Sequence, residues 1–260
     1  MDDIEAAVAI AREAGGILRD GWSRDALVVR HKGTINPVTE IDQSSEALIV
    51  ERLRHAFPKH GVVAEEGHVI QGESDARWIV DPLDGTTNYI KRIPWVAVSL
   101  GLEVAGRLVL GVVYNPILEE LFMAWEGKGA SLNGVPIHVA KTPDLAQALL
   151  GTGFPYDAWD NPRDNTAEWR HFLKRCHYCH CDGSAALDLC QVAMGRLDGH
   201  WESGLFAWDM AAGIVILREA GGVVTDYNGG QDMLTRRELV AANPVLQAKL
   251  RAELAQIRTS

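Results

Sequence analysis

The sequence predicts a single domain built as a layered α+β or α/β sandwich, in which helices cover β-sheets. Two observations carry this prediction. Apolar residues recur at helical spacing in several segments, and short β-rich runs separated by Gly, Asn and Pro occupy the middle of the chain. The chain has 260 residues, of which 47% are hydrophobic, so it can bury a substantial core.

Two amphipathic helices are predicted at the start of the chain. The first spans residues 3–19, with Asp2 or Asp3 as its N-terminal cap and Gly21 after its end. The second spans residues 40–57, and a proline stops it.

Short strands follow in the middle of the chain. We expect them at residues 61–67, 78–82, 96–104, 108–116 and 120–127. The last three form an antiparallel meander, because an Ala-Gly-Arg turn signal separates the first two of these three runs.

The second half alternates between helix-like and strand-like segments. Helices are predicted at residues 167–176, 184–195, 208–221 and 244–257. Strands are predicted at residues 148–154, 176–181, 199–203, 221–226 and 238–243. The change of pattern puts a soft boundary near residue 140. It divides one domain of residues 1–260 into an N-terminal α+β lobe and a C-terminal α/β lobe.

The charge balance narrows the class of partner. A net charge of −10 argues against nucleic-acid binding, which normally uses a basic surface. It still allows a phosphorylated substrate, because carboxylates can hold cations that in turn hold phosphate. The acidic N-terminus is unlike a secretory signal, and no apolar run approaches the ~20 residues that span a bilayer. We therefore expect a cytoplasmic protein without a membrane partner.

The stretch WIVDPLDGTTNYIKR, residues 78–92, ends an apolar run on two acids. Asp84 alone could form a turn with Gly85 or cap a helix. Together, Asp81 and Asp84 repel each other unless a cation lies between them. Mg²⁺ prefers carboxylate and water ligands, so the pair predicts a magnesium site.

Other acids occupy comparable positions. Glu65 and Glu66 end the short apolar run GVVA, and Asp209 starts a long apolar helix. Taken singly, the glutamates could form a solvated turn and Asp209 could complement the helix dipole. Each, however, lies at one terminus of a buried element. Amide groups at Gly85 and Thr86, at a helix start, favour phosphate. The combination indicates metal-assisted phosphoester hydrolysis.

These motifs resemble the inositol monophosphatase family of Mg²⁺-dependent, lithium-sensitive phosphatases. The resemblance rests on AEEG, WIVDPLDGTTNY and AWDMAAGIVILREAGG, and extends to KGTINPVTEIDQSSE and GSAALDLCQVAMGRLDGHWE. It covers essentially the whole chain. It implies one inositol monophosphatase-like domain with an αβαβα sandwich, two to three Mg²⁺ ions per site, and a homodimer.

The resemblance also implies roles for single residues. The implied metal ligands are Glu65, Asp81, the carbonyl of Leu83, Asp84 and Asp209, with help from the hydroxyl of Thr86. The implied catalytic residues are Glu65, Thr86 and Asp81, because Glu65 and Thr86 would orient the attacking water. The implied substrate contacts are Asp84, Gly85, Thr86, Gly183, Ser184, Ala185, Glu202 and Asp209. Lys32 and Asp42 match the family's mobile loop.

The implied reaction is hydrolysis of a small polyol or sugar-like phosphate, with myo-inositol 1-phosphate as the best single candidate. Alternatives within the family are phosphatases for histidinol phosphate, fructose 1,6-bisphosphate or 3′-phosphoadenosine phosphates. Outside enzymes, the alternative is a binding module that docks on a larger assembly. The complete set of acids favours the enzyme.

The segment HFLKRCHYCHCDGS departs from the family pattern before the GSA motif. The cluster of Cys176, Cys179 and Cys181, with two histidines nearby, invites a zinc hypothesis. A CxxC without a second ligand pair matches zinc poorly, so we favour reduced cysteines that act as small apolar residues. At this segment the resemblance predicts neither the substrate specificity nor the dimer contact.

Overall fold

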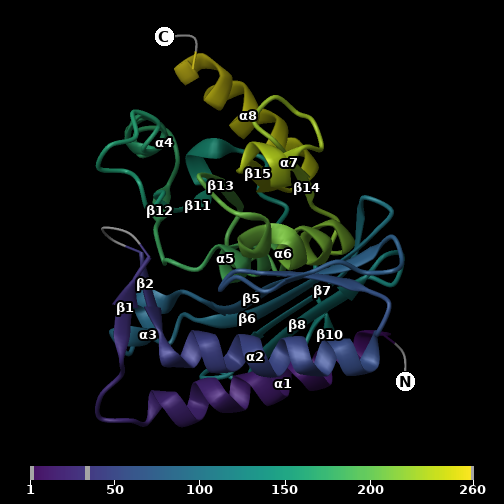
Figure 1. The fold of residues 1–260 in the computed structure, drawn as a ribbon. Coiled ribbons are helices and arrows are strands. Elements are labelled where there is room, and N and C mark those ends of the chain that lie inside the picture. The colour runs from purple at the N-terminus through teal and green to yellow at the C-terminus, as the bar shows by residue number, and fades with distance from the viewer. Residues whose placement is uncertain (1–2, 33–35, 259–260) are drawn as a thin grey trace.

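Two β-sheets alternate with three layers of helices (Figure 1). The structure, a computed structural model, describes residues 3–32 and 36–258. The predicted cap Asp2 and residues 33–35 of the predicted loop lie outside this described part. Its helices are α1 (Asp3–Trp22), α2 (Glu40–Ala56), α3 (Thr86–Ile90), α4 (Thr166–Phe172), α5 (Ala185–Ala193), α6 (Ala207–Glu219), α7 (Met233–Arg236) and α8 (Pro244–Arg258).

The larger sheet is mostly antiparallel, and only β3 and β5 pair in parallel. Its strands β6, β7 and β8 form the predicted meander. In order across the sheet, the strands are β10 (Val135–Pro136), β9 (Ala130–Leu132), β8 (Glu120–Trp125), β7 (Arg107–Asn115), β6 (Ala97–Val104), β5 (Ala76–Asp84), β3 (Gly61–Ala64) and β4 (Val69–Ile70).

The smaller sheet mixes parallel and antiparallel pairs, and β12 and β14 form its edges. In order, its strands are β12 (Tyr178–His180), β11 (Leu149–Thr152), β13 (Gly199–Ser203), β15 (Glu238–Ala242) and β14 (Val223–Thr225). A separate two-stranded sheet pairs β1 (Val29–His31) with β2 (Pro37–Thr39), and a 3₁₀ turn spans Leu145–Gln147.

The layers follow from which faces the helices cover. Helices α1 and α2 pack on the outer face of the larger sheet, and α5 and α6 lie between the two sheets (Figure 1). Helix α8, with α4 beside it, packs on the far side of the smaller sheet. Three hydrophobic cores fill the spaces between these layers. The predicted αβαβα sandwich is therefore confirmed.

Several predicted boundaries were wrong. Gly21 does not follow α1 but lies inside it, where an added Cβ would lie 2.4 Å from the Tyr89 hydroxyl. The glycine therefore serves close packing rather than helix termination. Helix α4 ends at Phe172 and strand β12 begins at Tyr178, so the predicted helix and strand that meet at residue 176 are both shorter.

Helix α6 lies unusually close to the larger sheet. A Cβ on Gly111 of β7 would lie 2.3 Å from the Ala212 carbonyl oxygen, and a Cβ on Gly101 of β6 would lie 2.8 Å from the Ala211 Cβ. Only glycine permits this approach at both positions. The start of α6 is thus held firmly against the sheet that carries the predicted acids.

Among the described helices, none combines the length and the apolar character needed to span a bilayer.

Candidate active site

Asp81 and Asp84 lie on either side of an irregularity in β5. Asp81 pairs with Ser99 and Asp84 with Ala97, and the register shifts between them. We expected Pro82 to end the strand, but the strand continues to Asp84. A proline lacks an amide hydrogen, so it is tolerated where the ladder is already interrupted.

Asp81 is 2% exposed, and its Oδ1 accepts from the Leu83 amide at 3.0 Å. Burial raises the pKa of Asp81 well above its usual range, and the charges of Glu65, Asp84 and Asp209 raise it further. Acids from three separate segments therefore lie close enough to repel one another. A carboxylate in this position is stabilised either by a proton or by a cation.

Asp84 is fixed by the start of α5. Its Oδ2 accepts from the Ser184 hydroxyl at 2.6 Å and from the Ala186 amide at 2.9 Å. Burial raises the pKa of Asp84 to about 7, although these two donors lower it. Gly85 follows with a φ of 89°, and an added Cβ would lie 2.7 Å from the Trp95 carbonyl oxygen. The turn after Asp84 therefore requires glycine.

Asp209 lies in the first turn of α6, and its Oδ2 accepts from the Phe206 amide at 2.6 Å. Its pKa is raised well above the usual range by burial and then by the charge of Asp84. The predicted start of this helix, at residue 208, is one residue late. Asp209 thus caps the start of α6 and also lies near Asp84 of β5.

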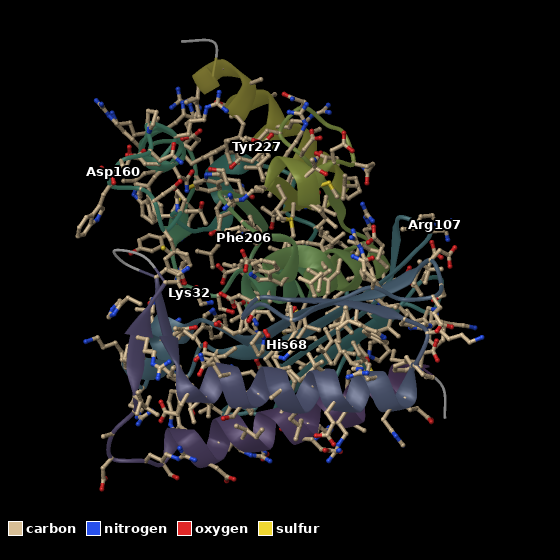
Figure 2. The ribbon with its side chains drawn as sticks, viewed as in Figure 1. Lys32, His68, Arg107, Asp160, Phe206 and Tyr227 are labelled. Atoms are coloured by element: carbon tan, nitrogen blue, oxygen red, sulfur yellow. The ribbon has the colours of Figure 1, made fainter. Side chains whose placement is uncertain are left out.

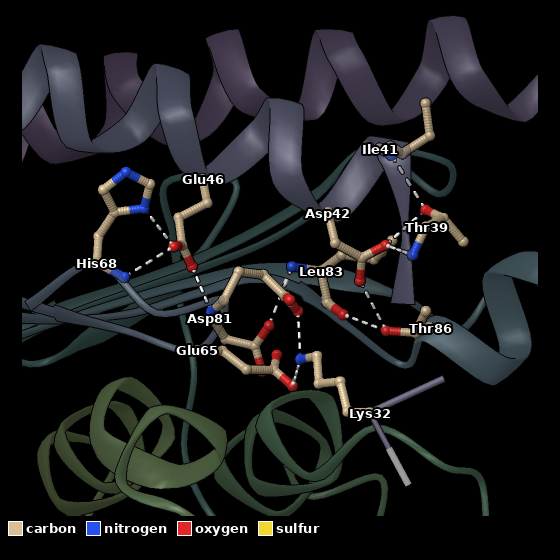
Figure 3. Close-up of polar contacts among 11 residues, drawn as sticks. Lys32, Thr39, Ile41, Asp42, Glu46, Glu65, His68, Asp81, Leu83 and Thr86 are labelled. Atoms are coloured by element: carbon tan, nitrogen blue, oxygen red, sulfur yellow. Dashed lines mark hydrogen bonds and ion pairs between the residues drawn. The ribbon is translucent and has the colours of Figure 1, made fainter. Parts of the chain in front are cut away.

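Lys32 approaches the same acids from the segment after β1. Its Nζ donates to Glu65 Oε1 at 3.0 Å and also to Glu66 Oε1 (Figure 3). Burial opposes the charge of Lys32, but the two carboxylates outweigh it and raise the pKa of the ammonium. The pKa of Glu65 is raised by burial and lowered by Lys32, with a net rise.

Asp42 lies in α2, within the helix predicted over residues 40–57, although the resemblance matched it to the family's mobile loop. Together with Thr39 it forms the capping box of this helix, and it is fully buried. Its Oδ1 accepts from the Thr86 hydroxyl at 2.9 Å (Figure 3). The Thr86 hydroxyl also lies 3.2 Å from the Leu83 carbonyl oxygen. Burial raises the pKa of Asp42 to about 6.

The structure gathers part of the predicted set around one cavity of about 240 Å³. The predicted residues that line it are Asp84, Gly183, Ser184, Ala185, Glu202 and Asp209. The remaining predicted metal ligands and substrate contacts do not line this cavity: Glu65, Asp81, Leu83, Gly85 and Thr86. A larger cavity of about 770 Å³ lies beside β8 and β9 and contains none of the predicted site residues.

A second hollow of about 330 Å³ adjoins the cavity of about 240 Å³. Lys32 and Phe206, both labelled in Figure 2, line it, and Tyr156 lines both spaces. An aromatic and basic rim therefore borders the acidic cavity. Sequence analysis had assigned only Lys32 among these three residues.

Glu202 lies on β13 and lines the same cavity as Asp84. Its Oε2 lies 3.1 Å from His200 Nε2, and the other ring nitrogen of His200 lies 3.9 Å from Asp188 Oδ2. His200 is fully buried. Sequence analysis missed both His200 and Asp188. The His-x-Glu spacing offered a signal for the former, because residues two apart share one face of a strand.

The donor chemistry of the site suits a hard cation, because carboxylate, carbonyl and hydroxyl oxygens dominate it. Within residues 3–32 and 36–258, however, no three His, Cys, Asp or Glu side chains already form a metal-binding group. Lys32 engages Glu65, and the helix start engages Asp84. These side chains would have to turn towards an ion before they could bind it.

Comparison with known proteins gives one family. A model described as the inositol monophosphatase family matches residues 2–259. The Nus factor SuhB of Pasteurella multocida is 45% identical over 240 residues, which cover 92% of this chain and 90% of that protein. An inositol-1-monophosphatase of Mesorhizobium japonicum is 43% identical over 245 residues, which cover 94% and 92%.

Solved structures agree with the fold. The extragenic suppressor protein suhB from Bartonella henselae superposes with a TM-score of 0.92 at 41% identity, covering 98% of both chains. An inositol monophosphatase from Anabaena (Nostoc) sp. PCC 7120 superposes with a TM-score of 0.89 at 38% identity, covering 97% of this chain and 95% of that one.

Proposed function

The chain belongs to the inositol monophosphatase family, and on that premise we propose that it is a Mg²⁺-dependent phosphomonoesterase. The observation that carries the proposal is geometric: Asp81 and Asp84 flank the irregularity of β5, and Asp84 and Asp209 line one cavity. Burial raises the pKa values of Glu65, Asp81, Asp84 and Asp209, which agrees with a site for cations. Buried acids that repel one another beside a cavity destabilise the fold, but they form a good site for divalent cations.

The proposed cation ligands are Glu65, Asp81, the Leu83 carbonyl, Asp84 and Asp209, for two to three Mg²⁺ ions. Oxygen-only donors agree with this choice of metal. When bound, the ions supply positive charge that activates water and stabilises the leaving oxygen. Members of the inositol monophosphatase family generally require a metal ion, and we propose that this ion is magnesium here.

The protein's own contribution to water activation would come from Thr86 and Glu65. The Thr86 hydroxyl donates its one hydrogen bond to Asp42 Oδ1, at 2.9 Å. The lone pairs of Thr86 are then available to accept a hydrogen bond from water. Glu65, once free of Lys32, is the carboxylate that would take the proton of that water. The amides of Gly85 and Thr86 would hold the phosphoryl oxygens.

Substrate recognition would come from the other wall of the cavity. Glu202 can accept hydrogen bonds from substrate hydroxyls, and Gly183, Ser184 and Ala185 border the same space. A carboxylate here favours a polyol or sugar-like phosphate, with myo-inositol 1-phosphate as the first candidate. Histidinol phosphate, fructose 1,6-bisphosphate and 3′-phosphoadenosine phosphates remain the alternatives.

The test is a phosphatase assay over a panel of these phosphomonoesters, with Mg²⁺ or with a chelator. We expect turnover only with the metal. Asp84→Asn and Asp209→Asn should each lower kcat by about a hundredfold or more, because each removes a charged ligand of the ion. Isothermal titration with Mg²⁺ should show weaker binding in both variants.

Asp144→Asn is the matched control, because Asp144 is an exposed acid that pairs with Lys249. It should keep normal turnover. Normal turnover in both site variants would refute the metal assignment, whereas inactivity of the wild type on the whole panel would refute the substrate class.

A second candidate is a binding module in a larger assembly. The observation that favours it is the name of several relatives, Nus factor SuhB, including one from Pasteurella multocida at 45% identity. The distinguishing experiment restores Asp84→Asn to cells that lack the gene. Full rescue by this inactive variant would indicate a binding role, and failure to rescue would indicate the enzyme.

We also propose a homodimer with no direct nucleic-acid contact, the latter because the net charge is −10. Sedimentation analysis tests the dimer, and an electrophoretic shift assay tests nucleic-acid binding.

A further inference from the structure

Two cysteines meet at the edge of the smaller sheet. Cys179 lies on β12, opposite Leu150 of β11, and Cys176 precedes the strand by two residues. Their Sγ atoms are 3.2 Å apart. A disulfide needs a separation of about 2 Å, so a movement of about 1 Å would join them.

The two thiols differ in exposure. Cys176 is partly exposed, whereas Cys179 is 4% exposed and packs in the core beneath α8. Cys181 and Cys190 have no comparable sulfur neighbour among the hydrogen bonds of the described residues. One accessible thiol beside one buried thiol is the arrangement of an attacking and a resolving cysteine.

The reactivity of the pair agrees with this division. The pKa of Cys176 is lowered, first by the hydrogen bond from Cys179 and then, against the effect of burial, by the backbone. The pKa of Cys179 is raised by the same contact and by burial. Cys176 therefore has the greater thiolate character, and the thiolate is the nucleophile.

The sequence already favoured reduced cysteines over zinc, because a CxxC without a second ligand pair matches a zinc site poorly. We propose that Cys176 and Cys179 are a reversible modification site that forms an intramolecular disulfide on exposure to a peroxide. A reversible bond also agrees with the rule that cytosolic disulfides are mostly transient or redox-sensing.

The reaction balances with one peroxide molecule. The Cys176 thiolate attacks a peroxide oxygen, so an S–O bond forms, the O–O bond breaks, and the departing hydroxide takes a proton to become water. The Cys179 sulfur then attacks the Cys176 sulfur, so the S–S bond forms, the S–O bond breaks, and a second water leaves with the Cys179 proton. Two electrons pass from the thiols to hydrogen peroxide.

Full-length protein treated with hydrogen peroxide, alkylated and digested with chymotrypsin tests this directly. Cleavage after Tyr178 separates the two cysteines, so a disulfide would keep the fragments linked until a thiol reductant is added. We expect this single crosslink, with Cys181 and Cys190 alkylated when the reagent is added under denaturing conditions. The assay needs no phosphatase activity, so its outcome is independent of the proposed function.

Cys176→Ser and Cys179→Ser should each lose the crosslink completely, whereas the control variants Cys181→Ser and Cys190→Ser should keep it. Serine nearly preserves the shape of cysteine, and circular dichroism checks that each variant is folded. The proposal is overturned if the wild type forms no crosslink, pairs Cys179 with Cys181, or links only between chains. The wild-type map alone decides this, even where a variant fails to fold.

Discussion

The imidazole of His200 lies between the Glu202 carboxylate, at 3.1 Å, and the Asp188 carboxylate, at 3.9 Å. On the other side, Gly153 leaves little room, since an added Cβ would lie 2.1 Å from Glu202 Oε1. Glu202 therefore has few alternative rotamers. A carboxylate fixed in this way can select the position of a substrate hydroxyl.

Replacing His200 by Phe removes the ring nitrogen that contacts Glu202 and leaves the buried Glu202 carboxylate without this partner. We expect KM for polyol phosphates to rise about tenfold, equivalent to about 1.4 kcal/mol, with a smaller change in kcat. His200→Gln, which keeps a donor, should recover most of the affinity. Kinetics on myo-inositol 1-phosphate and on phenyl phosphate check this prediction.

Phenyl phosphate has no hydroxyl for Glu202, so its KM should not change in His200→Phe. An equal loss on both substrates would mean that His200 only supports the fold.

The acids and the missed histidine differ in how visible they are in the sequence. Asp81 and Asp84 stand out because two carboxylates interrupt an apolar run. His200 and Asp188 become neighbours only when β13 packs against α5. That contact depends on the packing of separate elements, which local spacing does not encode.

Helix α6 sets the position of Asp209 relative to β5. Its backbone lies against Gly101 and Gly111, so the helix has no space to shift towards the sheet. The long helices and the meander were predictable because their periodicity extends over many residues. Short pairs such as β1–β2 and β9–β10 were not, because two or three residues carry no readable period.

Gly111→Ala should force α6 away from the sheet, because its Cβ would lie 2.3 Å from a backbone carbonyl oxygen. We expect a loss of about 1–3 kcal/mol in the free energy of unfolding. We also expect Mg²⁺ binding to weaken, since Asp209 moves with the helix. Urea denaturation and isothermal titration measure the two effects.

Gly16→Ala is the matched control. Gly16 lies in α1, and its added Cβ would have no neighbour within 4 Å. It should stabilise the protein by about 0.5–1 kcal/mol, as alanine does within helices. If Gly111→Ala stabilised the protein as this control does, the close approach of α6 to Gly111 would not contribute to the free energy of unfolding.

Buried acids on β5 and α2 make the stability of the whole molecule depend on pH. The pKa of Asp84 is about 7 in the folded state against 3.8 ordinarily, and that of Asp42 is about 6. The folded state therefore holds these protons to higher pH than the unfolded state does. Their contribution to stability is complete below about pH 4 and is lost as pH rises through 6 and 7.

In a chelator, the free energy of unfolding should therefore fall between pH 4 and pH 7, by up to about 1.4 kcal/mol per pH unit for each proton. Asp84→Asn should flatten this slope, and Asp144→Asn should not. Urea denaturation across this pH range measures it. Added Mg²⁺ should reverse the fall near neutral pH, because the cation replaces the proton. A free energy that rises with pH in chelator would contradict the account.

Helices α5 and α6 serve both sheets at once, since their side chains fill the space between them. A chain divided near residue 140 would leave the larger sheet without α5 and α6. In the other half, the apolar face of these helices would be exposed. Neither fragment would make a self-sufficient unit. The two lobes that the sequence predicts should therefore unfold in one transition, and the cavity that holds Asp84, Glu202 and Asp209 should be lost in that same transition.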